Sequence, residues 1–285
     1  MIILMTILLV IFIYILWQRW ELNKFKVSRY QIRSAKIKVP VSVAVIADLH
    51  GFSYGKKNER LLRETANINP QAILIPGDML VSKYPETYDT AYETFRELVK
   101  IAPVYYSYGN HESRLRDPER KHHLKFRQYL EGVRTLGVTV METESCSVCL
   151  GGNEVMLSSL ELELDYYEKG TIAPMEKYYV RKQLPLRKPE LFQILLAHNP
   201  AYAPRYAEWG ADVTFCGHNH GGLVRIPGIG SLISPQLTFF PKYDAGEFEI
   251  EGHHVIISRG LGTHTFHVRI FNRAELLAVE LLPES

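Results

Sequence analysis

Aspartate, histidine and asparagine side chains gather in five short motifs spread along the chain. The motifs are Asp48-Leu49-His50, Gly77-Asp78, Gly109-Asn110-His111-Glu112, His198 and Gly217-His218-Asn219-His220. Carboxylates combined with imidazoles form a ligand set for transition metals such as manganese, iron or zinc. Two metals need one bridging carboxylate and further ligands on either side, and this inventory supplies both. The sequence therefore predicts a two-metal site.

Each motif follows a segment that is typical of a buried β-strand. These segments are apolar and mostly β-branched, and they span residues 39–47, 72–75, 104–108, 191–197 and 213–216. Helical patterns at residues 56–68, 86–101 and 118–136 alternate with the first three, which favours parallel strands in an α/β fold. Because the carboxyl ends of parallel strands meet at one edge of a sheet, we expect the motifs to lie together.

The second half of the chain has a different character. Residues 146–150 and 155–159 flank Gly151-Gly152-Asn153, which predicts a β-hairpin. Short strands are expected near residues 247–257 and 274–282, whereas residues 161–190 show no clear pattern. Cys146 and Cys149 could form half a zinc site, but the chain has three cysteines and lacks a second pair, so core or surface packing is the simpler interpretation.

In their order, the five motifs resemble the calcineurin-like metallophosphoesterase superfamily from about Val41 to the C-terminus. The Gly-His-x-His-Gly-Gly sequence at residues 217–222 and the late Arg259-Gly260-Leu261-Gly262 resemble its membrane-anchored bacterial phosphodiesterase-like branch. The resemblance implies two mixed β-sheets packed as a sandwich and flanked by helices. It also implies hydrolysis of a phosphodiester or pyrophosphate bond by a hydroxide that bridges two divalent metals, Mn, Fe or Zn.

The resemblance also implies a role for each motif residue. Asp48, His50 and His220 would hold the first metal, while Asn110, His198 and His218 would hold the second, and Asp78 would bridge them. His111 would be catalytic and would protonate the leaving oxygen or stabilise phosphoryl charge. From its position beside His111, Glu112 is expected to orient His111 or the local backbone, with helix capping as the alternative. Arg259 and His264 are weaker candidates for substrate contact, with an ion pair and a surface position as the respective alternatives.

Departures from sister families narrow the expected substrate. Val81 stands where purple acid phosphatases carry a metal-bound tyrosine. The two phosphate-binding arginines of protein Ser/Thr phosphatases are missing after Asp78 and before Gly109, which favours diesters or pyrophosphates over monoesters. Two alternatives stay open: a UDP-2,3-diacylglucosamine pyrophosphate hydrolase of lipid A synthesis, and a scaffold of the same fold that has lost catalysis.

The N-terminus is predicted to be a membrane anchor. Residues 1–20 are almost entirely apolar, and a helix of that length spans roughly 30 Å. A cleaved signal peptide would need a basic start and a small-residue cleavage site, which are absent. Residues 21–38 are expected to form a basic linker before a domain spanning residues 39–285. This arrangement favours a single-pass protein with a cytoplasmic catalytic domain and a membrane-proximal, lipidic substrate.

Charge is distributed unevenly along the 285-residue chain. Residues 19–38 carry seven basic residues against one acidic residue, a net charge of +6, whereas the remainder carries −4. The basic stretch could hold anionic lipid headgroups or could only set the membrane orientation. An acidic body argues against nucleic acid as a partner and against a nuclease. The sequence does not determine the oligomeric state.

Overall fold

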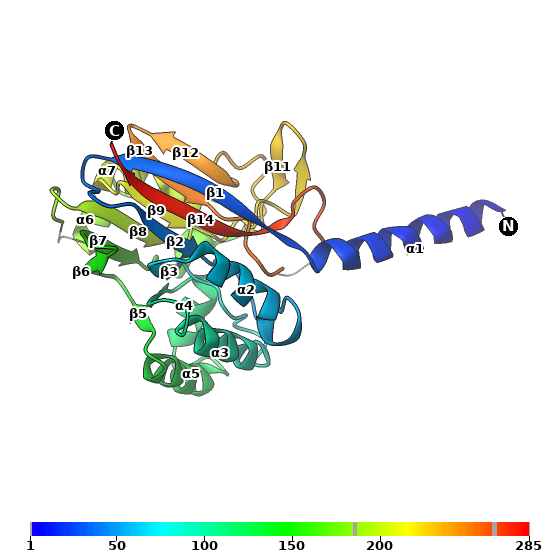
Figure 1. The fold of residues 1–285 in the computed structure, drawn as a ribbon. Helices are drawn as coiled ribbons and strands as arrows, with labels where there is room; N and C mark the ends of the chain where they lie inside the picture. The colour runs from blue at the N-terminus through cyan, green and yellow to red at the C-terminus, as the bar shows by residue number, and fades with distance from the viewer. Residues whose placement is uncertain (1, 185–186, 264–266, 285) are drawn as a thin grey trace.

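Two six-stranded sheets pack face to face with helices outside them (Figure 1). The structure is a computed structural model that describes residues 2–184, 187–263 and 267–284. One sheet has the strand order β1-β14-β2-β3-β4-β5 and the other β12-β13-β9-β8-β7-β6. Each sheet contains parallel and antiparallel pairs, which confirms the predicted α/β sandwich of two mixed sheets.

The first sheet is built from the first five strands of the chain and the last strand. Its strands are β1 (Phe25–Ser34), β14 (Ala274–Pro283), β2 (Val41–Val45), β3 (Ala72–Ile75), β4 (Val104–Ser107) and β5 (Thr139–Met141). The helices α2 (Glu59–Ile68), α3 (Thr87–Leu98), α4 (Asn110–Arg116) and α5 (His123–Thr135) lie between these strands in the chain. Apolar side chains of α2, α3 and α5 form one core cluster with the outer face of this sheet.

The second sheet is built from the C-terminal half. Its strands are β12 (Gly246–Ile250), β13 (His253–Ile257), β9 (Val213–Cys216), β8 (Phe192–Ala197), β7 (Asn153–Leu160) and β6 (Glu144–Leu150). The helices α6 (Tyr179–Gln183) and α7 (Ala203–Trp209) pack on its outer face. A separate hairpin, β10 (Val224–Ile226) and β11 (Gly230–Ile233), follows β9. The predicted hairpin around residues 151–153 is confirmed as β6 and β7.

Valine, isoleucine, leucine and phenylalanine side chains fill the space between the two sheets. Val43 and Val45 of β2 share this fully buried cluster with Ile194 and Leu196 of β8 and Phe215 of β9. Central parallel strands are covered on both faces, which explains their continuous apolar sequences. The sandwich therefore holds β2 and β3 of one sheet against β8 and β9 of the other.

The basic stretch after the first helix is not a linker, contrary to the expectation for residues 21–38. Phe25–Ser34 forms edge strand β1, which pairs in parallel with β14 along its whole length. Its apolar side chains face the two cores, with Ile32 fully buried, while Lys26, Arg29 and Arg33 point to solvent. The charged side chains protect an exposed sheet edge from further pairing. The partner strand lies about 250 residues away in sequence, so local pattern could not reveal the pairing.

Helix α1 (Ile2–Leu22) projects away from the body of the molecule (Figure 1). It is long and apolar enough to cross a membrane, and residues 2–16 expose their side chains. Its last turns contact the body: Gln18 exchanges two hydrogen bonds with the backbone of Arg269, and Glu21 pairs with Arg273 through both carboxylate oxygens. These contacts fix the end of the helix against the segment that leads into β14.

Candidate metal centre

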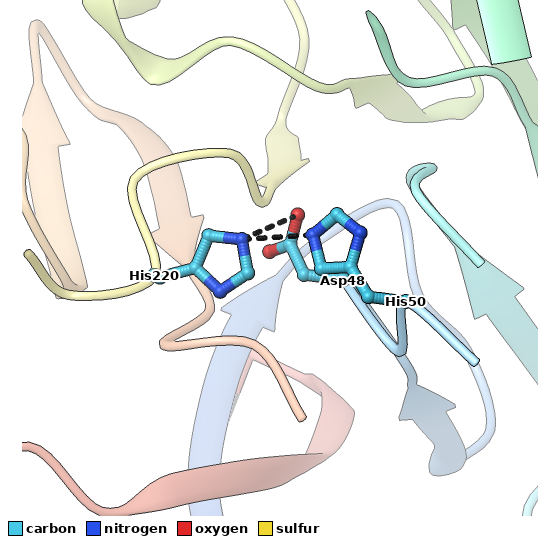
Figure 2. Close-up of side chains that lie close together, drawn as sticks. All are labelled: Asp48, His50 and His220. Atoms are coloured by element: carbon cyan, nitrogen blue, oxygen red, sulfur yellow. Dashed lines mark hydrogen bonds and ion pairs between the residues drawn. The ribbon is translucent and has the colours of Figure 1, made fainter. Parts of the chain in front are cut away.

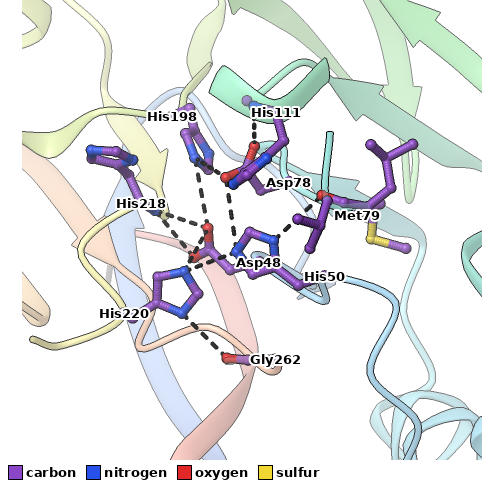
Figure 3. Close-up of polar contacts among 12 residues, drawn as sticks. Asp48, His50, Asp78, Met79, His111, His198, His218, His220 and Gly262 are labelled. Carbon is purple, nitrogen blue, oxygen red and sulfur yellow. Dashed lines mark hydrogen bonds and ion pairs between the residues drawn. The ribbon is translucent and has the colours of Figure 1, made fainter. Parts of the chain in front are cut away.

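All eight side chains of the predicted metal and catalytic set lie together where five strands end, and Figure 3 labels each of them except Asn110. From the first sheet, β2 leads to Asp48 and His50, β3 leads to Asp78, and β4 leads to Asn110 and His111. From the second sheet, β8 leads to His198 and β9 leads to His218 and His220. The side chains meet because both sheets direct the carboxyl ends of these strands to one edge of the sandwich.

Five of these residues have left-handed backbone conformations. The φ angles are 51° at Asp48, 50° at His50, 56° at Asp78, 66° at His218 and 48° at His220. For residues with a Cβ, this conformation costs on the order of 1–3 kcal/mol, and it persists only where the surroundings hold it in place. The sharp turns direct the side chains inward immediately after each strand, so part of the folding free energy is used to pre-organise the site.

One cluster consists of Asp48, His50 and His220 (Figure 2). The Nε2 atoms of His50 and His220 lie 3.0 Å apart, and the His220 Nε2 lies 3.7 Å from Asp48 Oδ1. The two imidazole rings stack with their centroids 4.9 Å apart. Two histidines and a carboxylate that converge in this way can hold one divalent transition metal.

Backbone carbonyls determine the tautomers of three site histidines. The Nδ1 atoms lie near the carbonyl oxygens of Leu80 for His50 (3.4 Å), Pro76 for His198 (3.0 Å) and Gly262 for His220 (3.2 Å). Because a carbonyl only accepts hydrogen bonds, each Nδ1 carries a proton, and in the neutral ring that a metal requires each Nε2 keeps its lone pair. Facing Nε2 lone pairs suit a bound cation, and histidine ligands of metals are oriented in this way.

A second set of atoms that could coordinate a metal has no hydrogen-bond partner among the described residues. These buried atoms are Asn110 Oδ1, His198 Nε2 and His218 Nε2, the three predicted ligands of the second metal. The His198 Nε2 lies 3.1 Å from Asp78 Oδ2, but this ion pair lacks hydrogen-bond geometry. Buried polar atoms without partners are unfavourable unless a ligand satisfies them, so this donor set fits a second cation.

Asp78 lies between the two sets. Its Oδ2 is 3.9 Å from His50 Nε2 on one side and 3.1 Å from His198 Nε2 on the other. Its Oδ1 accepts a hydrogen bond from the His111 backbone N–H at 2.9 Å. A carboxylate in this place can reach both cations, as a bridging ligand requires.

Burial and charge shift the pKa values of the clustered groups. Burial raises the pKa of Asp48 to about 7. Burial also opposes ionisation of Asp78, but the charges of His198 and His111 hold its pKa well below the usual range. Burial disfavours a charged His198, yet the Asp78 carboxylate raises the pKa of His198 to about 9. Without metals, a proton on His198 offsets the buried negative charge that bound cations would otherwise neutralise.

Glu112 supports the turn that carries Asp78. Its buried carboxylate accepts hydrogen bonds from the backbone N–H groups of Asp78, Met79 and Gly109 and from the Tyr106 hydroxyl. The prediction that Glu112 orients the local backbone agrees with these contacts. Gly109 allows the close approach, because a Cβ at this position would overlap the Asp78 carboxylate. A glycine is similarly required at Gly217, where a Cβ would lie 2.6 Å from Asp48 Oδ2.

A pocket of about 320 Å³ opens beside the Asp and His cluster. Asp78, Asn110, His111, His218 and His220 line it. Three cationic residues that the sequence did not point to, Lys83, Arg114 and Lys169, also line it. Arg114 lies on α4, one helical turn after Asn110, and this spacing of four residues is the signal that could have revealed it.

Of the two weaker substrate candidates, only Arg259 lies in the described part of the chain, and it is not among the residues that line this pocket. Arg259 lies near the end of α1, where its Nε is 4.0 Å from Glu275 Oε2, a contact that agrees with the ion-pair alternative. His264 falls outside the described residues. The predicted ligand and catalytic roles of the other residues stay predictions, although the structure brings all of them together.

The model of the calcineurin-like phosphoesterase family matches residues 41–222 of the chain. The chain belongs to the calcineurin-like phosphoesterase family. The matched range includes all eight converging side chains, from Asp48 to His220. As a family member the protein is a hydrolase acting on phosphoester bonds, and its Asp and His clusters form a dinuclear site for divalent metals.

Sequence alignments of this calcineurin-like phosphoesterase with two relatives cover nearly the whole chain. It is 23% identical to the phosphodiesterase YaeI of Escherichia coli (strain K12) over 267 residues, 92% of this chain and 88% of YaeI. It is 24% identical to the uncharacterized protein YpbG of Bacillus subtilis (strain 168), over 91% of this chain and 88% of YpbG. Among solved structures, the phosphopantetheinyl hydrolase of Mycobacterium tuberculosis aligns with a TM-score of 0.46 and 14% identity, over 76% of this chain and 88% of that one.

Proposed function

We propose that this phosphoesterase cleaves a phosphodiester or pyrophosphate bond in a substrate held at a membrane surface. The proposal rests on the three cations, Lys83, Arg114 and Lys169, that line the pocket beside the predicted metal ligands. If the metals hold the phosphoryl group that reacts, these cations remain available for a second anionic group of the substrate. A pyrophosphate, or a diester that carries a further charge, supplies such a group.

Within this proposal, each side chain of the cluster has a separate role in metal binding. Asp48, His50 and His220 would hold one metal, Asn110, His198 and His218 would hold the other, and Asp78 would serve both. When bound, such a metal pair neutralises phosphoryl charge and lowers the pKa of water. Manganese, iron and zinc all suit these ligands.

His111 is the proposed catalytic residue of the protein itself. The backbone N–H of Ser82 donates a hydrogen bond to His111 Nδ1 at 3.0 Å, and the Ser82 hydroxyl lies 3.0 Å from the same atom. The Nδ1 acts as the acceptor from the backbone, so in the neutral ring the proton lies on Nε2. His111 also lines the pocket, and its N–H can therefore donate to a phosphoryl or leaving-group oxygen.

We place the catalytic domain at the cytoplasmic face of a membrane, anchored by α1. The support is the apolar, exposed helix, the basic Arg19 in its last turn and the basic residues that follow it, beginning with Lys24 and Lys26. Membranes washed with high salt should retain the full chain. Protease added to intact cells should leave the domain uncut, and digestion of the domain under those conditions would reverse the orientation.

A substrate panel tests the reaction. The full chain, purified in neutral detergent and loaded with Mn²⁺, is offered bis-p-nitrophenyl phosphate, p-nitrophenyl phosphate and UDP-2,3-diacylglucosamine. We expect kcat/KM for the diester or the pyrophosphate to exceed kcat/KM for the monoester. An equal or higher value for the monoester would overturn the proposed bond type.

The role of the pocket cations is tested with Arg114→Gln. The control is Arg127→Gln, which removes the same charge on the exposed side of α5. Loss of one charged hydrogen bond to substrate should lower kcat/KM for the pyrophosphate by roughly 10- to 100-fold. The effect on bis-p-nitrophenyl phosphate, which has no second charge, should be smaller. Equal losses on both substrates would remove Arg114 from recognition of a second anion.

A further inference from the structure

A second recess, separate from the metal centre, lies where α1 meets the body. We call it the α1 groove; its volume is about 340 Å³ and it is lined by Trp17, Trp20, Glu21, Lys26, Arg259, Phe271 and Arg273. These residues come from the last turns of α1, the start of β1 and the segment before β14. None of them lines the pocket beside the metal centre.

The α1 groove has an excess of positive charge. Lys26, Arg259 and Arg273 line it, against the single carboxylate Glu21. Glu21 occupies only one edge of the Arg273 guanidinium, with contacts of 2.9 Å to Nε and 2.8 Å to Nη2. The side chains of Lys26 and Arg273 are 44% and 40% exposed, so both can reach a ligand in the groove.

A buried acid below the groove holds two of these cations in place. Glu275 is almost fully buried, and its Oε2 lies 3.5 Å from Lys26 Nζ and 4.0 Å from Arg259 Nε. The Ser28 hydroxyl and the Arg259 backbone N–H also donate to this carboxylate. Glu275 therefore faces the protein interior, and Lys26 keeps an exposed head toward the groove.

Aromatic side chains complete the α1 groove. The Trp20 ring is 52% exposed, with Lys24 Nζ 3.4 Å and Arg273 Cζ 5.7 Å from its centroid. Phe271 is 66% exposed at the groove edge. Tryptophan beside cations, at the end of an apolar helix, matches the headgroup level of a bilayer, where amphipathic rings and basic side chains contact lipid.

We infer that the α1 groove binds the headgroup of an anionic phospholipid, with the lipid phosphate against Lys26, Arg259 and Arg273. This inference rests on the membrane part of the proposed function, because α1 must cross the bilayer for the groove to lie at headgroup level. It assigns Arg259 to binding of a membrane lipid and not to contact with the substrate. The ligand is part of the membrane itself and not the substrate that is cleaved.

The test uses the full chain in neutral detergent and measures binding of phosphatidylglycerol and phosphatidylcholine by native mass spectrometry. We expect wild type to bind one phosphatidylglycerol at least about tenfold more tightly than phosphatidylcholine. Lys26→Gln/Arg259→Gln should lose this preference. The matched control Arg29→Gln/Arg33→Gln makes the same charge change on exposed positions of β1 and should keep it.

Further measurements distinguish a loss of lipid binding from a loss of folding. The melting temperature of each variant in neutral detergent shows whether it is folded. If the double variant unfolds, Lys26→Gln alone is used, and we expect it to lose part of the preference for phosphatidylglycerol. Inorganic phosphate at millimolar concentration should not displace the lipid. Equal affinity for both lipids, or equal loss in the control variant, would overturn the inference. Release of the full chain by high salt would instead refute the anchor.

Discussion

At the scale of single residues, the site is defined by where protons and lone pairs lie. Backbone carbonyls hold Nδ1–H of His50, His198 and His220, so the Nε2 atoms face the cluster as acceptors. His111 has the opposite arrangement, since its Nδ1 accepts from Ser82 and its Nε2 carries the proton. These two arrangements fit the predicted roles, metal binding for His50, His198 and His220 and proton donation for His111.

Loss of the His111 imidazole should impair chemistry and spare the metals. His111→Ala should lower kcat by about 10²–10⁴-fold with a poor leaving group, because that oxygen needs a proton as it departs. With p-nitrophenolate as the leaving group the loss should be smaller. Equal losses on good and poor leaving groups would leave stabilisation of phosphoryl charge as the role of His111, and an emptied metal site would make it a ligand.

Asp78 should control the metal content of the whole site. Its Oδ2 lies between the two sets of ligand atoms, so Asp78→Ala should lose both metals and all activity. Asn110→Ala removes one neutral donor and should mainly weaken one metal. Elemental analysis of the purified variants measures the stoichiometry, and two metals retained per chain in Asp78→Ala would disprove the bridging role.

At the scale of elements, tight turns bring backbone close to the two buried carboxylates. Gly109→Ala should therefore displace Asp78, because the added Cβ would overlap its carboxylate. The φ angle of Gly109 is −97°, so the substitution adds no left-handed strain and the effect belongs to the contact alone. We expect reduced metal content, measured by elemental analysis.

Gly152→Ala is the control for that variant. Gly152 lies in the β6–β7 hairpin with open space around it, and its φ of 88° makes an added Cβ unfavourable for the backbone only. It should lower stability by roughly 1 kcal/mol and leave the metal content unchanged. Similar metal loss in both variants would mean that general destabilisation, and not the Asp78 contact, empties the site.

Edge strand β1 determines where the anchor can be removed. Deletion of residues 1–22 should leave the sandwich folded, because α1 contacts the body only through its last turns. Deletion of residues 1–38 removes β1 and the buried Ile32, and it should lower the melting temperature by about 10 °C or more. Equal melting temperatures of the two truncated chains, measured by scanning calorimetry, would show that β1 adds no stability.

At the scale of the whole molecule, stability and metal binding are linked by buried charge. In the metal-free chain, the folded-state pKa of His198 is raised to about 9 and that of Asp48 to about 7. A raised pKa stabilises the fold at low pH, and that stabilisation is lost as pH rises through the folded value. Chelated protein should therefore lose stability between about pH 4 and 7 through Asp48 and between about pH 6.5 and 9 through His198.

Metal-loaded protein should not show this decline, because bound cations replace the proton on His198 and favour ionised Asp48. Chemical denaturation of both forms across this pH range measures the difference. The gap between the two stabilities should widen as pH rises. Parallel pH profiles for the chelated and loaded forms would contradict a metal site built on these two residues.

The sequence alone determined the fold class, the membership of a phosphoesterase family and the set of converging side chains. It did so because apolar strand patterns are local and because the motifs directly follow strands. Tertiary structure decided what depends on contacts between distant segments. Strand β1 pairs with the distant strand β14. Arg114 and Lys169 come from separate segments to line one pocket, whereas Arg259 lies in the α1 groove and is not among the residues that line that pocket. The histidine tautomers likewise depend on carbonyls such as Gly262 O, which only the folded chain brings to the ring.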